Sequence, residues 1–228
     1  MTLADRVTLA RLGLMPVIVV AYLALPPWLG FWVVGWTCAL AEYTDLLDGR
    51  IARARDEVSD FGKLADPFCD VIYRIGVFLV FLLPAGGTAF AVGPDHLAYA
   101  DIPGQLVILA ADGTAHAGLL PWLPVFLMVL REIVAGALRA MSATKGLVLA
   151  ARTSGKIKAW VQGVTIISCV GFPAVFFSES LWMLQWATAA AWLCAGLSVI
   201  SIGEYIWVNL PLLAQLIDRK PLKETPKP

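Results

Sequence analysis

Four aspartates, arranged as two pairs, are the residues of this chain whose type and spacing could do chemistry. Asp45 and Asp48 are three residues apart near the end of an apolar segment, and Asp66 and Asp70 are four apart at the start of the next one. On a helix, spacings of three or four residues put both members of a pair on one face. Each pair therefore offers two carboxylates along a single helical face.

Small residues accompany both pairs. Gly49 and Ala52 lie on the same helical face as the first pair, and the four positions together cover about a third of the helix circumference. Gly62 lies four residues before Asp66, which is itself four residues before Asp70, so it shares the face of the second pair. Both faces are therefore acidic and have room beside the carboxylates. If the two helices face each other, the pairs form a cage of carboxylates.

Such a cage predicts a divalent metal. Carboxylates near a bilayer are costly unless they are paired or bound to cations. Ligation by oxygen alone fits Mg²⁺, Mn²⁺ or Ca²⁺ and argues against zinc or copper, and a catalytic metal pair that bridges phosphate oxygens is the natural use. The alternative is that the aspartates sit at helix ends in a wet interface and pair with the basic residues of the intervening turn, Arg50, Arg53, Arg55 and Lys63.

Composition indicates that the helices carrying these residues lie in a membrane. The chain has 228 residues, of which 59% are hydrophobic and 15% charged, and its mean hydropathy is +0.77. These values lie far outside those of soluble globular domains. Lys and Arg number 17, as do Asp and Glu, so net charge gives no reason to expect a nucleic-acid partner.

Six apolar stretches are each long enough to cross about 30 Å of hydrocarbon as a helix, which predicts an all-α integral membrane protein of one domain. They cover residues 12–29, 31–47, 64–83, 120–141, 157–177 and 181–213. Lys and Arg are confined to the N-terminal segment, alternate turns, the adjoining halves of two spans, and the tail. The positive-inside rule then puts both termini and the aspartate-rich turn in the cytoplasm.

The segments outside the spans give weaker signals. Residues 1–12 have apolar residues at helical spacing with charges between them, which predicts an amphipathic helix in the interface. In the extracytoplasmic loop, residues 84–119, an apolar run at 106–109 followed by Asp112 and Gly113 predicts a hairpin, and His116 is expected to be solvated. Residues 214–228 form a predicted cytoplasmic tail.

Taken together, the positions resemble the signature of the CDP-alcohol phosphotransferase family. The motif runs Asp45-x-x-Asp48-Gly49-x-x-Ala52-Arg53, eight residues, and Gly62-x-x-x-Asp66-x-x-x-Asp70. Other blocks resemble the phosphatidylglycerophosphate synthases of that family, namely Thr8-x-x-Arg11, Arg131-Glu132-Ile133, Leu138-Arg139 and Gly155-Lys156-x-Lys158.

The resemblance implies six transmembrane helices, a homodimer in the cell membrane, and transfer of a phosphatidyl group from CDP-diacylglycerol to glycerol 3-phosphate with release of CMP. It implies two Mg²⁺ or Mn²⁺ ions on the four aspartates, with Asp70 also the general base. It further implies nucleotide-binding residues, Gly49, Ala52, Arg53 and Gly62, and acceptor phosphate-binding residues, Arg131, Arg139, Lys156 and Lys158.

Departures from the synthase pattern leave the acceptor open. Asp5, Glu42 and Val71 stand where the synthases usually have Asn, a small or hydroxyl residue, and Lys. Inositol phosphate, serine or phosphatidylglycerol are alternative acceptors for the same chemistry, and an ion transporter or a non-catalytic scaffold are the alternatives of another class. Arg74, one turn beyond Asp70, is expected to point into the protein toward a carboxylate or the acceptor pocket.

Overall fold

The computed structural model of the chain describes residues 3–55, 60–87, 91–92, 104–109, 111, 114–144, 153–176 and 181–217. These residues form six α-helices, a short 3₁₀ helix and three strands. The helices are α1 (Leu3–Ala24), α2 (Pro27–Arg55), α3 (Asp60–Val80), α5 (Trp122–Thr144), α6 (Thr153–Phe176) and α7 (Leu181–Ile217), and the 3₁₀ helix is η1 (Ala85–Gly87). The strands are β1 (Ala91–Val92), β2 (Gln105–Leu109) and β3 (Ala115–Pro121).

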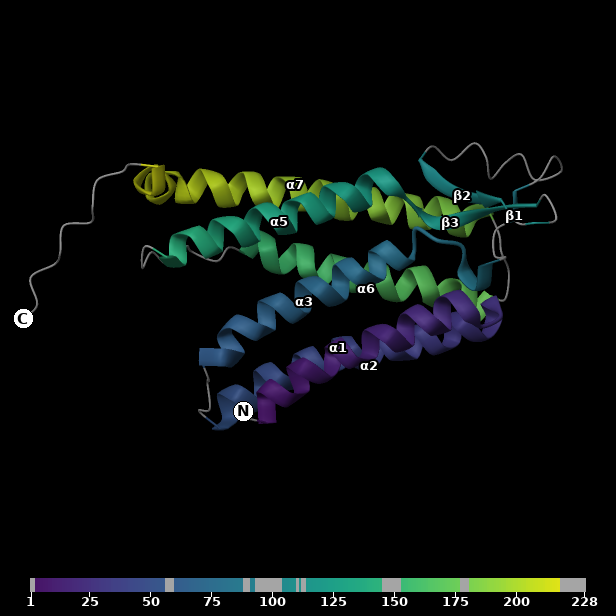
Figure 1. Cartoon of the computed structure of the whole chain (residues 1–228), viewed down its shortest axis with the longest axis horizontal. Helices are drawn as coiled ribbons and strands as arrows, with labels where there is room; N and C mark the ends of the chain where they lie inside the picture. The colour runs from purple at the N-terminus through teal and green to yellow at the C-terminus, as the bar shows by residue number, and fades with distance from the viewer. Residues whose placement is uncertain are drawn as a thin grey trace, which may run out of the picture.

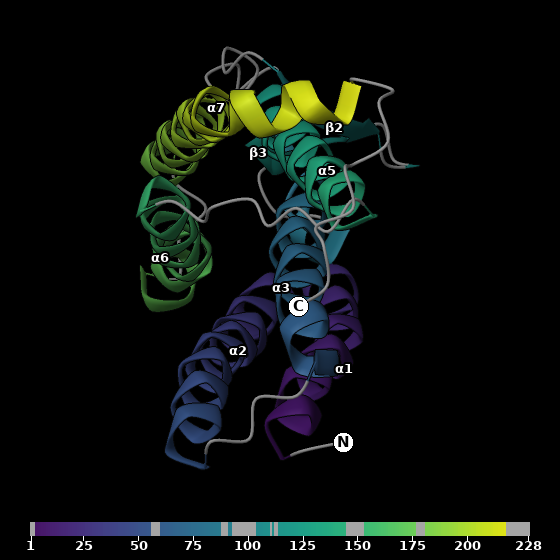
Figure 2. The same cartoon turned by 90° about the vertical axis from the view of Figure 1, so that its left-hand side faces the viewer.

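The helices lie along one another in a bundle, and the strands gather at one end of it (Figure 1). The chain's N-terminus, the end of α2 and the start of α3 lie at the opposite end. Seen from that end, α3 runs near the middle, with α1 and α2 on one side of it and α5, α6 and α7 on the other (Figure 2). Both aspartate pairs therefore belong to the end of the bundle that is far from the sheet.

Each of the six predicted apolar segments forms a helix, but the start of the chain differs from the prediction. The expected interfacial helix and the first span are one continuous helix, α1, so the separate helix over residues 1–12 was wrong. Arg11, which made this segment look like a surface helix, is only 2% exposed and pairs with Asp70 of α3. The interfacial position of the first turns of α1 stays a prediction, because the side chains of residues 3–9 lie outside the described residues.

Two prolines set the boundary between the first two helices. The predicted first span reached residue 29, whereas α1 ends at Ala24 and α2 begins at Pro27. The carbonyl of Pro26 accepts hydrogen bonds from the amides of Leu29 and Gly30, at 3.0 and 2.8 Å. Proline suits the first helical position because its missing N–H would have no partner there.

The predicted hairpin is present and belongs to a small sheet, so the fold is mostly helical rather than all-α. The strand order is β1-β3-β2 with antiparallel pairing, and Ile108 of β2 lies opposite His116 of β3. β3 is largely buried against the ends of the helices, and the Leu120 amide donates to the Phe81 carbonyl at 3.0 Å. His116 is consequently 7% exposed, not solvated as expected, and its Nε2 lies 3.0 Å from the Thr114 hydroxyl.

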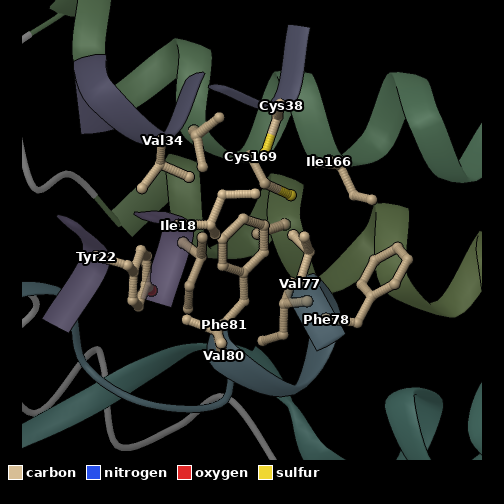
Figure 3. Close-up of a cluster of buried hydrophobic side chains, with 14 of the residues drawn as sticks. Ile18, Tyr22, Val34, Cys38, Val77, Phe78, Val80, Phe81, Ile166 and Cys169 are labelled. Carbon is tan, nitrogen blue, oxygen red and sulfur yellow. The ribbon is translucent and has the colours of Figure 1, made fainter. Parts of the chain in front are cut away.

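The core draws buried apolar side chains from all six helices and from β3, and Figure 3 shows labelled members of it from α1, α2, α3 and α6. The ring centroids of Tyr22 and Phe81 are 5.2 Å apart, and the Tyr22 hydroxyl donates to the carbonyl of Leu83. All four cysteines, Cys38, Cys69, Cys169 and Cys194, are buried, and none of them forms a disulfide.

The outer surface of the bundle is apolar. Large apolar side chains are exposed on all six helices, among them Val20, Trp36, Leu79, Ile133, Trp160 and Trp207. Within the described residues, two helical stretches are long and apolar enough to cross a membrane, Ile157–Phe176 and Trp182–Leu210, and a shorter apolar stretch covers Ala10–Ala24. Exposed apolar surface of this extent indicates that the protein is associated with a membrane.

Candidate functional site

Asp70 is the predicted site aspartate whose side chain the structure describes, and it lies between two arginines. Its Oδ1 accepts a hydrogen bond from Nη1 of Arg11 at 2.9 Å, and its Oδ2 is 3.6 Å from Nε of Arg74, one turn further along α3. The Asp70 side chain remains 32% exposed, whereas that of Arg11 is 2% exposed. The two arginines thus hold the Asp70 side chain, and its carboxylate stays partly accessible.

Arg74 connects three helices. Its Nη2 donates to Oε2 of Glu42 on α2 at 3.1 Å, and its Nη1 donates to the backbone carbonyl of Ala159 on α6 at 2.7 Å. The side chain therefore points into the protein toward carboxylates, which confirms the prediction made for it. Arg11, Glu42, Asp70 and Arg74 together form a cluster, here called the base cluster, that joins α1, α2, α3 and α6.

A glycine makes room for this cluster. A Cβ atom on Gly163 of α6 would lie 3.0 Å from Oε2 of Glu42 and 3.2 Å from Nη1 of Arg74. Contacts this short would displace both side chains. The absence of a side chain at Gly163 therefore lets α6 approach the pair closely enough for the Ala159 carbonyl to reach Arg74.

The other predicted site residues of α2 and α3 have described helical backbones, but their side chains lie outside the described residues. They are Asp45, Asp48, Gly49, Ala52 and Arg53 on α2, and Gly62 and Asp66 on α3. Since α2 is helical to Arg55, positions 45 and 49 share a face with Glu42, at three and seven residues beyond it. The four-aspartate cage itself stays a prediction, and no group of three or more potential metal ligands occurs among the side chains that are described.

The donor atoms at Asp70 are nonetheless suited to a hard divalent cation. The acidic side chains of the base cluster, Asp70 and Glu42, present carboxylate oxygens, the ligand atoms preferred by Mg²⁺ and Mn²⁺. Asp70 is also partly exposed, so that a ligand can reach it. Asp70 therefore fits such an ion, and the ligand roles of Asp45, Asp48 and Asp66 stay predictions because their side chains lie outside the described residues.

A second charged cluster joins α5, α6 and α7, and is called here the cationic cluster. Glu132 of α5 accepts hydrogen bonds from Nη1 of Arg131, at 3.1 and 3.0 Å, and from Nζ of Lys158 on α6. Nη2 of Arg131 donates to the hydroxyl of Ser201 on α7 at 2.9 Å. Two cations thus share one buried carboxylate.

The structure brings together two of the four predicted acceptor-binding residues, Arg131 and Lys158. Arg139 is two turns beyond Arg131 on α5, has an exposed side chain, and donates from Nε to the carbonyl of Ala135 at 3.3 Å. Lys156 is on α6, and its side chain lies outside the described residues. Whether these residues bind an acceptor stays a prediction.

Sequence reasoning missed the parts played by Glu42 and Gly163. Glu42 was noted only as a departure from a family pattern, yet it lies three residues before Asp45 and so extends the acidic face of α2. That spacing could have identified it. Gly163 carried no local signal, because its contact is with side chains from α2 and α3.

Comparison with known proteins places this geometry in context. The model of the CDP-alcohol phosphatidyltransferase family matches residues 1–200, and divalent metal ions are generally used in that family. A Bacillus subtilis (strain 168) protein is 27% identical over 219 residues, covering 91% of this chain and 94% of its own length, and is named CDP-diacylglycerol–glycerol-3-phosphate 3-phosphatidyltransferase.

Two further relatives bear the same name. The Mycoplasma genitalium protein is 28% identical over 194 residues, which cover 80% of this chain and 64% of its own length. The Rickettsia bellii protein is 35% identical over 81 residues, which cover 36% of this chain and 44% of its own length. The similarity thus extends along most of this chain for the Bacillus and Mycoplasma proteins, and over about a third of it for the Rickettsia protein.

Proposed function

Because the chain belongs to the CDP-alcohol phosphatidyltransferase family, we propose that it transfers the phosphatidyl group of CDP-diacylglycerol to glycerol 3-phosphate, with release of CMP. The observation that carries the proposal is the complete eight-position motif, which α2 and α3 carry on adjoining parts of the chain. The named relatives support glycerol 3-phosphate as the acceptor, since the Bacillus protein is similar over 94% of its own length.

Asp70 is the proposed general base. The hydroxyl oxygen of the acceptor forms a bond to the phosphorus next to the lipid, the bond from that phosphorus to the CMP oxygen breaks, and Asp70 takes the hydroxyl proton. The hydrogen bond from Arg11 orients the carboxylate for this role. Its partial exposure gives the acceptor a route to the carboxylate.

Asp45, Asp48, Asp66 and Asp70 are the proposed ligands of one or two Mg²⁺ or Mn²⁺ ions. Such ions, when bound, would neutralise the pyrophosphate oxygens and stabilise CMP as the leaving group. Gly49, Ala52 and Gly62 would leave space for the nucleotide, and Arg53 would offset phosphate charge.

The cationic cluster is the proposed place of the acceptor phosphate, together with Arg139 and Lys156. Arg131 and Lys158 are balanced by one carboxylate, Glu132, so this cluster carries a surplus of positive charge among the side chains described. A guanidinium can bind phosphate oxygens bidentately. The surplus supports recognition of an anionic acceptor over a neutral one such as serine.

The same reasoning extends to the setting of the protein. We propose six transmembrane helices in the cell membrane, both termini and the aspartate pairs on the cytoplasmic side, and a homodimer. The exposed apolar side chains on all six helices support the spans. The location of the sheet at the end of the bundle away from the N-terminus supports the orientation (Figure 1).

CMP release by the purified protein in detergent tests the proposed function. CDP-diacylglycerol and Mg²⁺ or Mn²⁺ are supplied with glycerol 3-phosphate, inositol 1-phosphate, serine or phosphatidylglycerol in parallel. Release that depends on glycerol 3-phosphate and on the metal is the expected result. Release with a different acceptor alone would retain the chemistry and reject this acceptor, and no release from folded, metal-binding protein would reject the activity.

A further inference from the structure

We infer that Arg74 is a positioning residue, which fixes the carboxylate of Asp70 relative to α6, the helix that carries Lys158. The inference rests on the proposed function, in which Asp70 takes the proton of the acceptor and Lys158 belongs to the cluster that binds the acceptor phosphate. It assigns to Arg74 no contact with the substrate.

The guanidinium of Arg74 is directed by partners on three helices. Nη2 is bound by Glu42 of α2 at 3.1 Å, Nη1 by the Ala159 carbonyl of α6 at 2.7 Å, and Nε faces Oδ2 of Asp70 at 3.6 Å. Because a guanidinium is planar and rigid, fixing its two terminal nitrogens also fixes the direction of Nε. Through Arg74, the position of Oδ2 therefore depends on the positions of α2 and α6.

Arg11 completes the arrangement from the other side of the carboxylate. Its Nη1 is 2.9 Å from Oδ1 of Asp70, and its side chain is 2% exposed. Each oxygen of the carboxylate therefore faces a different buried arginine. The hydrogen bond from Arg11 and the ion pair with Arg74 at 3.6 Å together restrict the carboxylate more than a single contact would.

The contact with α6 relates the base to the acceptor. Ala159, whose carbonyl holds Arg74, directly follows Lys158 in α6. A shift of Arg74 would change the distance between Asp70 and the cationic cluster, and a misplacement of about 1 Å can lower a rate about 100-fold. The expected consequence is on the chemical step rather than on binding of the lipid nucleotide.

Gly163 allows this arrangement to be disturbed without removing a charge. In Gly163→Ala, the new methyl group would lie 3.0 Å from Oε2 of Glu42 and 3.2 Å from Nη1 of Arg74. Gly171, two turns further along α6, provides the matched control, because a Cβ there would meet nothing within 4 Å. Both substitutions replace a helical glycine with alanine, so they raise helix propensity by a similar amount.

The experiment compares kcat, KM for each substrate and the melting temperature of Gly163→Ala, Gly171→Ala and the unchanged protein. We expect kcat of Gly163→Ala to fall about tenfold or more, with KM for CDP-diacylglycerol within about twofold and the melting temperature not lowered. Gly171→Ala should keep the kcat of the unchanged protein. Equal kcat in the two variants would overturn the inference and leave the proposed function intact, whereas an unchanged protein that releases no CMP would overturn both.

Arg74→Lys provides a second, independent measurement. Lysine keeps the positive charge but has no planar fork with which to contact α2, α6 and Asp70 together. We expect kcat to fall by about tenfold or more, again with little change in KM for CDP-diacylglycerol. A lysine variant with the full kcat would show that charge alone suffices and would overturn the positioning role.

Discussion

The base cluster and the cationic cluster both join helices through charged side chains, but their charges balance differently. The base cluster is a chain of alternating charges, in which Arg11 contacts Asp70, Asp70 contacts Arg74, and Arg74 contacts Glu42. In the cationic cluster, Arg131 and Lys158 converge on the single carboxylate of Glu132. The first arrangement holds its groups in fixed relation to one another, while the second keeps positive charge available for an anion.

α6 belongs to both clusters through adjacent residues. The Ala159 carbonyl binds Arg74 of the base cluster, and the Lys158 ammonium binds Glu132 of the cationic cluster. The base cluster and the cationic cluster are thus contacted by two consecutive residues of α6. This juxtaposition suits a reaction in which an anionic acceptor must meet a fixed base.

The largest expected effect is at the base. Asp70→Asn removes the group that takes the proton, so CMP release should fall about 1,000-fold or more. The unchanged protein and the variant are compared in the CMP assay, with melting temperature as the check of folding. A variant that retained a tenth of the rate would contradict the role of Asp70 as base.

The next effect concerns the stability of the cationic cluster. Glu132→Gln leaves Arg131 and Lys158 without their shared counter-charge, and removing one partner of a buried ion pair costs about 3–5 kcal/mol. We expect a clear fall in melting temperature in detergent. Glu42→Gln should cost less, because Arg74 keeps Asp70 and the Ala159 carbonyl.

Added phosphate tests whether the two clusters, represented by Glu132→Gln and Glu42→Gln, differ in their ability to bind an anion. Inorganic phosphate should restore more of the melting temperature of Glu132→Gln than of Glu42→Gln, because only the cationic cluster is expected to accept an anion. Sodium chloride at equal ionic strength serves as the control. Equal recovery in both variants would show that the two clusters do not differ in this respect.

A smaller effect is expected on acceptor binding. Lys158→Met should raise KM for glycerol 3-phosphate about tenfold or more, the loss expected for a hydrogen bond to a charged group, while KM for CDP-diacylglycerol stays nearly constant. The two KM values are measured by varying each substrate at saturating concentration of the other. A change confined to CDP-diacylglycerol would remove Lys158 from the acceptor site.

The smallest effect should come from a neutral contact beside the base cluster. Tyr73 is buried and donates from its hydroxyl to the carbonyl of Cys38 at 3.4 Å, which joins α3 to α2 as Arg74 does but without charge. Tyr73→Phe should lower stability by about 1 kcal/mol or less and change kcat less than about twofold. A large fall in kcat would show that any link between these helices matters as much as the ion pairs do.

The sequence predicted the features that depend on local pattern. The six helices follow from the apolar stretches, the hairpin from the apolar run before Asp112 and Gly113, and the inward direction of Arg74 from the cost of a charge at that depth. What it did not predict depends on partners that are distant in the chain. Arg11 looked like a surface residue because Asp70 lies 59 residues away, and His116 looked solvated because the burial of β3 depends on where the helices end.

Glu42 shows how a departure from a pattern can be explained once a partner is known. In isolation, an acidic residue one turn before Asp45 only adds negative charge to α2. In the structure it pairs with Arg74, and Gly163 leaves the space that the pair requires. These three positions lie on three helices, so no spacing rule within one helix could have connected them.

The separation of Arg74 from its partners has a consequence for how the chain enters the bilayer. Arg74 is synthesised 85 residues before Ala159, whose carbonyl it finally contacts, but after Glu42, 32 residues earlier. In the proposed six-span topology, the hairpin of α2 and α3 can therefore insert with this arginine already neutralised by a carboxylate, which reduces the cost of placing it in hydrocarbon. Arg74 then acquires its last contact when α6 arrives, so the arrangement around Asp70 is finished only after α6 has joined α2 and α3.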